Sequence, residues 1–226
     1  MNASPPTMPD AGLSQEQSAV ADGRWQLLRR AALEQDCRYV WGVLDTAADE
    51  ALHGLLQQHH PAPTIAGREL EPLCLYDGQA GVRYARYAPY LLLFSTATAP
   101  TPLLAQWLVH GWAKAWGIFL CSKSLPQDLK RHLKKLHIAS GANRQKLLLR
   151  FYDPRVLPCL LAGLSDRNRA RYFGSEVVRA YFAPLPDGGL WQGTLKLNHW
   201  WSNWAGTAPL CSEKHLAPDS RHGIHS

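Results

Sequence analysis

Short apolar runs alternate along the chain with stretches in which apolar residues recur every three or four positions, as on one face of a helix. The runs predict four mostly buried strands, which lie at 39–44, 73–76, 118–121 and 147–152. Strands that alternate with helices usually form parallel sheets. We therefore predict an α/β fold, mixed with α+β features, in which the sheet is partly parallel.

Composition and pattern together divide the chain into four parts. Residues 1–22 are rich in Pro, Ser, Gln and Ala, and we expect them to be disordered. Residues 23–155 form the predicted α/β lobe, and residues 156–204 form a smaller C-terminal part in which helices are followed by a hairpin. Residues 205–226 are expected to be a flexible tail.

The segment 147–157 joins one predicted strand to a helix through a sharp corner. Asp153 can accept hydrogen bonds from the first free N–H groups of that helix. Arg150 lies on the same side of the strand as Tyr152 and needs a carboxylate or several carbonyl groups as partners, and Asp153 is a candidate. The corner either holds an internal ion pair or uses Arg155 and its neighbours to grip an acidic or C-terminal segment of a partner.

Asp45 stands at a second corner of the same kind, where the run at 39–44 gives way to helical spacing. Each aspartate can simply cap its helix. The alternative is a small enzyme that uses Asp45, Asp153 and Arg150 on an anionic substrate, which requires a shared pocket and a carboxylate with a perturbed pKa. The chain has no phosphate-binding glycine loop, nucleophile elbow or zinc-protease motif, so we predict no catalytic residue and no cofactor.

The predicted helix at 125–136 separates its leucines from its cations. Lys130 and Lys134 lie opposite the leucine face, together with Arg131 and Lys135. Such a basic face is either simply solvated or binds an acidic partner surface. The histidines of this region do not share one face of the helix, so the sequence predicts no metal site.

Composition and charge narrow the class of protein. Nine Trp indicate a large aromatic core or an aromatic binding surface, for which Trp200 and Trp201 are the candidates. The formal net charge of +6 leaves nucleic-acid binding as an alternative, although basic residues are not interleaved with aromatic ones.

Five widely spaced Cys predict free thiols in a reducing compartment. With no secretory signal and no membrane-spanning stretch in the sequence, we expect a cytoplasmic protein.

Several short motifs follow one another in a fixed order along the chain. They begin with the strand at 39–45, continue through a Pro-aromatic-Leu strand at 89–92, and end with an Arg-Phe-Tyr-Asp-Pro-Arg corner at 150–155 and Tyr172-Phe173-Gly174. In this order they resemble the effector chaperone and adaptor family of bacterial type VI secretion, a family long described as a domain of unknown function.

The resemblance implies a cytoplasmic binding protein and not an enzyme. It also implies two partners, a secreted toxin effector and the spike (valine-glycine-repeat) protein, with no nucleic acid and no membrane span. The corner, the basic helix and the aromatic C-terminal part are the expected contact surfaces. The candidate partner-binding residues are Arg150, Tyr152, Asp153, Arg155, Lys130, Lys134, Trp200 and Trp201.

Overall fold

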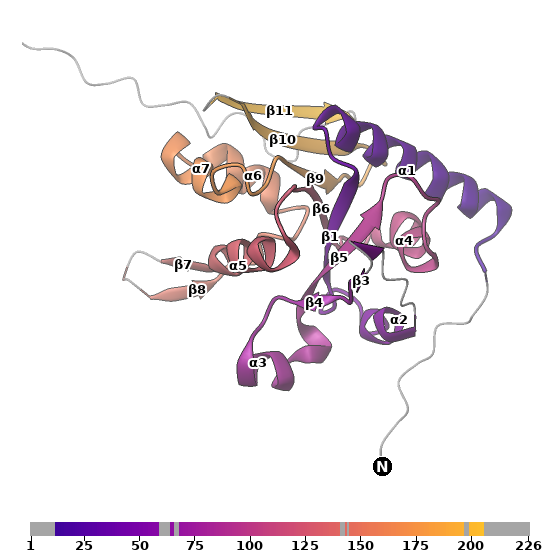
Figure 1. Cartoon of the computed structure of the whole chain (residues 1–226), viewed down its shortest axis with the longest axis horizontal. Helices are drawn as coiled ribbons and strands as arrows, with labels where there is room; N and C mark the ends of the chain where they lie inside the picture. The colour runs from indigo at the N-terminus through magenta and orange to yellow at the C-terminus, as the bar shows by residue number, and fades with distance from the viewer. Residues whose placement is uncertain are drawn as a thin grey trace, which may run out of the picture.

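The computed structural model describes residues 12–58, 64–65, 68–140, 143, 145–196 and 199–205; at 58, 64–65, 68–69, 140, 196 and 199–205 it describes the backbone alone. Its centre is a seven-stranded sheet in the order β11-β10-β9-β6-β1-β5-β4 (Figure 1). The strands are β1 (Tyr39–Asp45), β4 (Leu73–Cys74), β5 (Pro89–Ser95), β6 (Gly117–Cys121), β9 (Ala180–Pro184), β10 (Leu190–Lys196) and β11 (His199–Ala205). Two short hairpins lie outside this sheet, β2 (Thr64–Ile65) with β3 (Arg68–Glu69) and β7 (Ile138–Ser140) with β8 (Lys146–Leu148).

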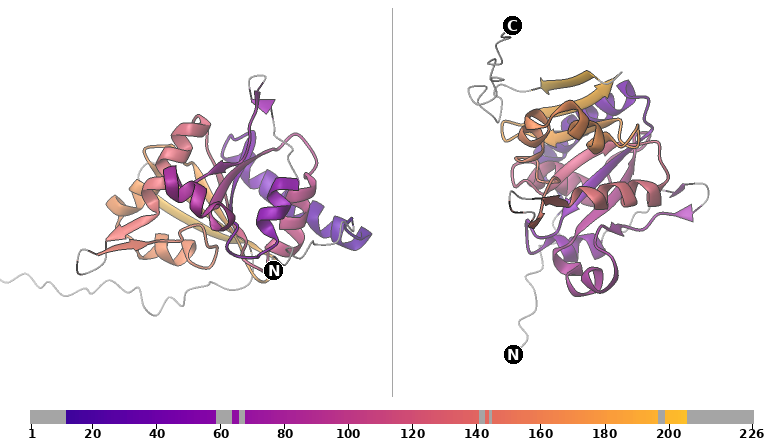
Figure 2. Two further views of the ribbon diagram at one scale, coloured as in Figure 1. Left: turned by 90° about the horizontal axis from the view of Figure 1, so that it is seen from below. Right: turned by 90° about the vertical axis from the view of Figure 1, so that its left-hand side faces the viewer.

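Helices cover both faces of the sheet, as Figure 1 and the two turned views of Figure 2 show. One face packs against α1 (Gln15–Glu34), α2 (Leu52–Gln58) and α4 (Pro102–Gln106), which runs on into η2 (Trp107–Gly111). The other face packs against α5 (Pro126–Leu136), α6 (Leu157–Gly163) and α7 (Asp166–Phe173). The short helices α3 (Gly78–Arg83) and η1 (Ala85–Tyr87) connect β4 to β5. The fold is therefore mixed α/β in three layers.

The prediction of a partly parallel sheet is wrong, because every pair of neighbouring strands in the described sheet is antiparallel. The order of the strands gives the reason. β5 and β6 are joined by a helix and run in the same direction, since each is antiparallel to β1. However, β1 lies between them, so the helical connection does not produce a parallel neighbour.

The continuous apolar runs of the sequence arise because the sheet is buried on both faces. In β1, Val40 and Leu44 belong to the core beneath α1, α2 and α4. Trp41 and Val43 point to the opposite core beneath α5, α6 and α7. Antiparallel sheets often leave one face in water and then show an apolar–polar alternation. Here the second helical layer removes that alternation, and a run of this kind predicts burial but not strand direction.

The tryptophans with described side chains are all core residues. Trp107, Trp112 and Trp116 are each no more than 2% exposed and lie in the core shared by α1, α2 and α4. Trp25, Trp41 and Trp191 are equally buried. The aromatic-core interpretation is therefore confirmed for these six positions.

The helix α1 begins at Gln15, inside the stretch 1–22 that the sequence predicted to be disordered. Ser14 and Gln17 form a reciprocal capping box, and Ala21 is buried against the sheet. Residues 1–11 and 206–226 lie outside the described residues, and the disorder predicted for them stays a prediction.

Cysteine chemistry differs from the prediction at one position. Cys37, Cys74 and Cys121 are free thiols, as predicted. Cys159 is disulfide-bonded, so the prediction of a free thiol is wrong there. Cys159 lies on α6 outside both apolar cores and is only half-buried, so the apolar residues around it in the sequence did not indicate burial of this cysteine.

The apolar run at 147–152 is not a buried strand of the sheet, as the sequence had predicted. Its first residues form β8, which pairs with β7 alone and whose side chains are exposed. The chain then turns inward, so that Phe151 and Tyr152 enter the core beneath α5 and α6. The run fails as a strand signal because it combines an exposed hairpin with a buried turn.

Candidate functional site

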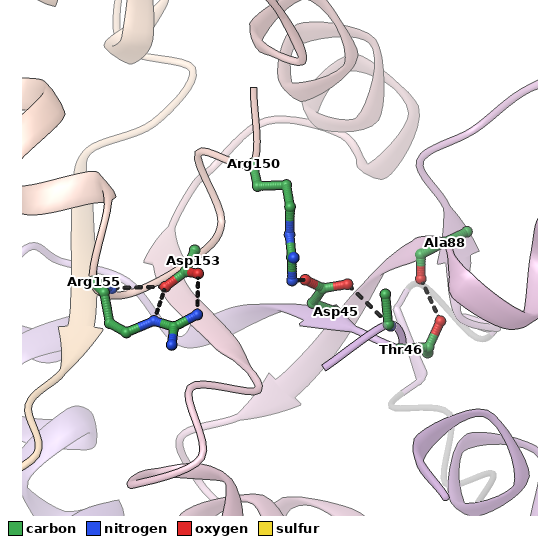
Figure 3. Close-up of polar contacts among 7 residues, drawn as sticks. Asp45, Thr46, Ala88, Arg150, Asp153 and Arg155 are labelled. Atoms are coloured by element: carbon green, nitrogen blue, oxygen red, sulfur yellow. Dashed lines mark hydrogen bonds and ion pairs between the residues drawn. The ribbon is translucent and has the colours of Figure 1, made fainter. Parts of the chain in front are cut away.

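Two chain segments that are 105 residues apart in the sequence meet through one ion pair. β1 ends at Asp45, and the chain leaves β8 through Arg150. The Nη2 group of Arg150 donates a hydrogen bond to Oδ2 of Asp45, and Figure 3 shows the guanidinium pointing at this carboxylate. The Asp45 side chain is 2% exposed, whereas that of Arg150 is 45% exposed. The pair therefore buries its anion and presents its cation to solvent.

Asp153 pairs with Arg155, so the predicted pairing of Asp153 with Arg150 is wrong. The Nε and Nη2 groups of Arg155 lie 2.9 and 2.6 Å from the two carboxylate oxygens, a two-point contact visible in Figure 3. The backbone N–H of Arg155 also donates to Oδ1 at 2.9 Å. This bond closes a turn that precedes α6, which begins at Leu157 with Val156 as its N-cap, so the prediction that Asp153 caps the helix is wrong. The bond holds the carboxylate toward Arg155 and leaves Arg150 to the buried Asp45.

The surroundings of Asp153 and of Arg150 favour the charged form of each group. Burial alone would raise the pKa of Asp153, but the hydrogen bonds and the charge of Arg155 hold it below its ordinary value. Burial alone would lower the pKa of Arg150, but the hydrogen bond and the charge of Asp45 raise it above its ordinary value. The corner therefore keeps two fixed arginine cations.

This geometry does not favour the small-enzyme alternative. Asp45 and Asp153 each accept hydrogen bonds from an arginine and from a backbone N–H group, which belongs to Ala47 in the first case. A carboxyl group whose pKa lies below its ordinary value is ionised at neutral pH and cannot serve as a general acid. The two aspartates instead hold the arginines and the turns that follow Asp45 and Asp153 in place.

Tyr152 is a support for the corner and not part of its surface. Its side chain is 2% exposed, and its ring centroid lies 5.3 Å from that of His137 and 5.5 Å from that of Phe151. Burial raises the pKa of its phenol far above the ordinary value, so the hydroxyl stays protonated. Tyr152 therefore fixes the turn that carries Arg150 and Arg155.

The basic helix α5 uses part of its charge within the molecule. Lys130 Nζ lies 3.0 Å from Asp77 Oδ1, and Lys134 also forms an ion pair with Asp77. Asp77 immediately precedes α3, so the two lysines tie α5 to α3. Arg131 pairs with Asp128 on α5 itself at 2.7 Å. Lys130 and Lys134 therefore act first as intramolecular partners.

The hairpin of β7 and β8 exposes three apolar side chains, of which Leu147 and Leu148 lie in the run that the sequence predicted to be a buried strand. Ile138 is 59% exposed, Leu147 is 47% exposed and Leu148 is 63% exposed. Ile138 and Leu148 face each other across the two strands, so they form one apolar pair on the same side of the hairpin. Sequence reasoning missed this surface because an apolar run gives no sign of whether the strand joins a covered sheet.

Trp200 and Trp201 lie on β11, where their backbones pair with Leu195 and Thr194 of β10. The side chains of Trp200 and Trp201 lie outside the described part of the structure, so their assignment to a binding surface stays a prediction.

Of the remaining candidates, Arg150 and Arg155 expose their cations at one corner. Within the described residues, His, Cys, Asp and Glu form no group able to hold a metal ion.

Residues 40–171, more than half of the chain, match a protein-family model described as a domain of unknown function (DUF4123). The matched range runs from β1 into α7 and includes both aspartate corners and the exposed hairpin. The chain belongs to the DUF4123 family. This family is associated with effector adaptors of type VI secretion. No curated protein and no solved structure matches the chain.

Two further features of the DUF4123 chain concern its helices and the part of the sheet outside the family match. None of the helices that the structure describes is both long enough and apolar enough to cross a membrane. The strands β9, β10 and β11 follow the matched range and extend the same sheet. These strands are therefore the part of the described sheet that is not covered by the family match.

Proposed function

We propose that this DUF4123 protein is a cytoplasmic adaptor that binds a cognate toxin effector and helps load it onto the spike (valine-glycine-repeat) protein. The association of the family with effector adaptors supports a role in type VI secretion. The observation that carries the binding role is an exposed apolar hairpin next to two exposed arginines. In this role the protein binds and presents its client, and it catalyses no reaction.

The hairpin provides the surface that an apolar effector segment needs. In the described part of the chain β7 and β8 pair only with each other, so each strand keeps one edge whose N–H and C=O groups can accept an added strand. The pair Ile138 and Leu148 lies beside these edges and is largely in solvent. Exposed apolar patches of soluble proteins commonly mark binding sites. An extended effector segment can therefore bind here by strand addition.

The arginine corner provides the polar part of the contact. Arg150 follows Leu148 by two residues, so a segment bound along β8 reaches the corner at once. The Arg155 side chain is 67% exposed although it is fixed by Asp153, and a fixed guanidinium loses little entropy when it binds a carboxylate. The corner therefore suits an acidic or C-terminal segment of the effector or the spike.

Substituting the apolar pair tests the effector surface. We expect Ile138→Ser/Leu148→Ser to reduce capture of the effector by about tenfold or more, because strand addition loses its apolar contacts. Both residues are exposed, so the free energy of unfolding should change by less than about 0.5 kcal/mol per residue. Val82→Ser on α3, where Val82 is 83% exposed, is the matched control. Unchanged capture by the double variant would rule out the hairpin as the effector surface.

The predicted aromatic surface has its own test. If Trp200 and Trp201 contact the effector, Trp200→Ala/Trp201→Ala should reduce capture while the purified variant still unfolds cooperatively. Exposed aromatic residues contribute a large contact area for little lost conformational entropy. Full capture by this variant would assign effector binding to the hairpin and the corner alone.

A further inference from the structure

A second basic surface lies on the opposite side of α5 from the lysines that bind Asp77. A cavity of about 380 Å³ opens between α5, α7 and the turn that follows α7. Three cations line it, Lys135 from α5 and Arg167 and Arg171 from α7. His132 and Ser175 also line it, and the lining includes no carboxylate.

The charge of this cavity is not neutralised within the described part of the chain. Lys130 and Lys134 are balanced by Asp77, and the acidic residue nearest to Arg167 in the sequence, Asp166, binds Arg169 at 2.6 Å. By contrast, Lys135, Arg167 and Arg171 form no ion pair with any described carboxylate, and all three are exposed. Three like charges at one cavity repel one another, and a bound anion relieves that repulsion.

The inner wall of the cavity is held by a specific contact. Nε2 of His132 lies 2.8 Å from the carbonyl oxygen of Tyr172, so this nitrogen carries a proton and donates the hydrogen bond. Gly174 follows at φ +58°, and a Cβ atom there would lie 2.4 Å from the His132 ring. The glycine thus lets the imidazole lie directly against the end of α7. This contact also joins α5 to the Tyr172-Phe173-Gly174 motif, since His132 and Tyr172 are 40 residues apart in the sequence.

The backbone turn beside the cavity is unusual. Ser175 and Glu176 continue the left-handed conformation of Gly174, with φ values of 53° and 76°. Residues other than glycine seldom adopt this backbone conformation, which typically costs about 1–3 kcal/mol where the surrounding structure imposes it. The turn places Ser175 at the cavity. The cavity is therefore shaped by a fixed wall and rim before any ligand binds.

We propose that this cavity, formed by Lys135, Arg167, Arg171 and Ser175, binds the carboxylates of an acidic peptide segment. Guanidinium groups recognise carboxylates through two parallel hydrogen bonds, and the serine hydroxyl can donate a third. The lining contains no Phe, Tyr or Trp on which a base could stack, and its one aromatic ring, the imidazole of His132, lies against Gly174 at the end of α7, which disfavours a nucleic-acid strand. That the segment belongs to the effector or the spike rests on the proposed function.

Anisotropy of a labelled hexaglutamate peptide with an amidated C-terminus tests this site directly. We expect the wild-type protein to bind it, and Arg167→Glu/Arg171→Glu to weaken binding by about tenfold or more. Arg30→Glu/Arg86→Glu changes the net charge equally at exposed positions on α1 and η1 and should change the affinity less than about twofold. Hexaglutamine should not bind. An equal loss in both double variants, or no binding at all, would overturn the proposal.

Two further variants separate charge from shape and ligand class. Gly174→Ala keeps every cation but displaces the His132 ring, and it should weaken peptide binding more than Gly163→Ala, where an added Cβ meets nothing within 4 Å. A single-stranded oligonucleotide of equal charge should bind more weakly than the peptide. Tighter binding of the oligonucleotide through the same arginines would overturn the peptide assignment.

The peptide experiment uses no effector, so its failure is distinguishable from failure of the proposed function. If the peptide does not bind while the wild-type protein still captures an effector, the cavity proposal falls and the adaptor role stands. If the peptide binds but no effector is captured, the cavity stands as a carboxylate site and the adaptor role falls.

Discussion

At the scale of single residues, the charged side chains of the corner first satisfy one another. Asp45 is buried and therefore needs a cation, and Arg150 supplies it from a distant part of the chain. Asp153 is almost as buried and takes its cation from Arg155. In both pairs the anion is the enclosed partner and the arginine remains accessible. This asymmetry allows an internal ion pair to be a binding surface as well.

The asymmetry predicts unequal effects of removing each partner. Arg150→Met leaves the buried Asp45 carboxylate without its cation and should destabilise the fold by about 3 kcal/mol. Asp45→Asn leaves a half-exposed guanidinium that water can solvate, and should cost only about 1 kcal/mol. Urea unfolding of both variants and of the double variant measures this. Equal losses of stability in the two single variants would contradict the prediction that the buried carboxylate depends more on its partner than the exposed guanidinium does.

His137 gives a second prediction at this scale, for the dependence of stability on pH. Its side chain is 5% exposed, and neither ring nitrogen has a hydrogen-bond partner. Burial, aided by the charge of Lys134, lowers its pKa from 6.5 to about 4. Between these values the unfolded chain binds a proton that the folded chain does not. Stability from this group is therefore present above pH 6.5 and is lost as the pH falls toward 4.

His137→Phe should remove this component. At about pH 4 the wild-type protein should have lost about 3 kcal/mol relative to neutral pH through this group, and the variant should lose correspondingly less. The aromatic neighbours Tyr76, Phe151 and Tyr152 surround the ring, so phenylalanine should fit without loss at neutral pH. Urea unfolding at both pH values is the measurement. The same pH dependence in both proteins would assign the acid sensitivity to other groups.

At the scale of elements, close contacts between backbone segments determine where β6 can begin. Gly117 has φ +152°, and a Cβ atom at this position would lie 1.9 Å from the carbonyl oxygen of Val43 on β1. The strand therefore approaches its neighbour in a way that only glycine allows. This close approach explains why β6 begins with a glycine.

Gly117→Ala should destabilise the protein by more than about 3 kcal/mol, because β6 must move away from β1 in the centre of the sheet. Gly163→Ala at the end of α6 is the matched control, since an added Cβ there has open space. Alanine favours the helix, so this control should be neutral or stabilising by about 0.5–1 kcal/mol. Thermal unfolding distinguishes the two. A small loss of stability in Gly117→Ala would contradict the close approach of β6 to β1.

The sequence predicted elements better than their arrangement. The strands at β1 and β6 and the leucine face of α5 followed from local pattern, because each is buried in a way that its own residues report. Strand direction depends on which strand lies between two others, and no local run encodes the position of β1 between β5 and β6. The exposure of Leu147 and Leu148 and the partner of Arg150 likewise depend on contacts that are distant in the sequence.

At the scale of the whole molecule, one sheet continues across the predicted lobe boundary near residue 155. β9 pairs with β6, and Phe182 faces Phe119 across this junction. Tyr181 and Phe182 point into opposite cores, so the strands after residue 179 complete both apolar layers. We therefore expect the two predicted lobes to fold together.

A shortened chain tests this expectation. A fragment of residues 12–178 lacks β9, β10 and β11, exposes the edge of β6 and opens both cores. It should show no cooperative transition in urea, whereas residues 12–205 should unfold in one step. Cooperative unfolding of the shorter fragment would contradict this expectation, because it would show that the chain before β9 folds without the C-terminal strands.

The measurement that tests the adaptor role most directly is affinity purification of the tagged protein from its native host, followed by quantitative mass spectrometry. We predict enrichment of one protein with a toxin domain together with a spike protein, and loss of the toxin protein when the bait carries Ile138→Ser/Leu148→Ser. Recovery of neither partner with the wild-type bait, at an abundance where the bait itself is readily detected, would contradict the adaptor role.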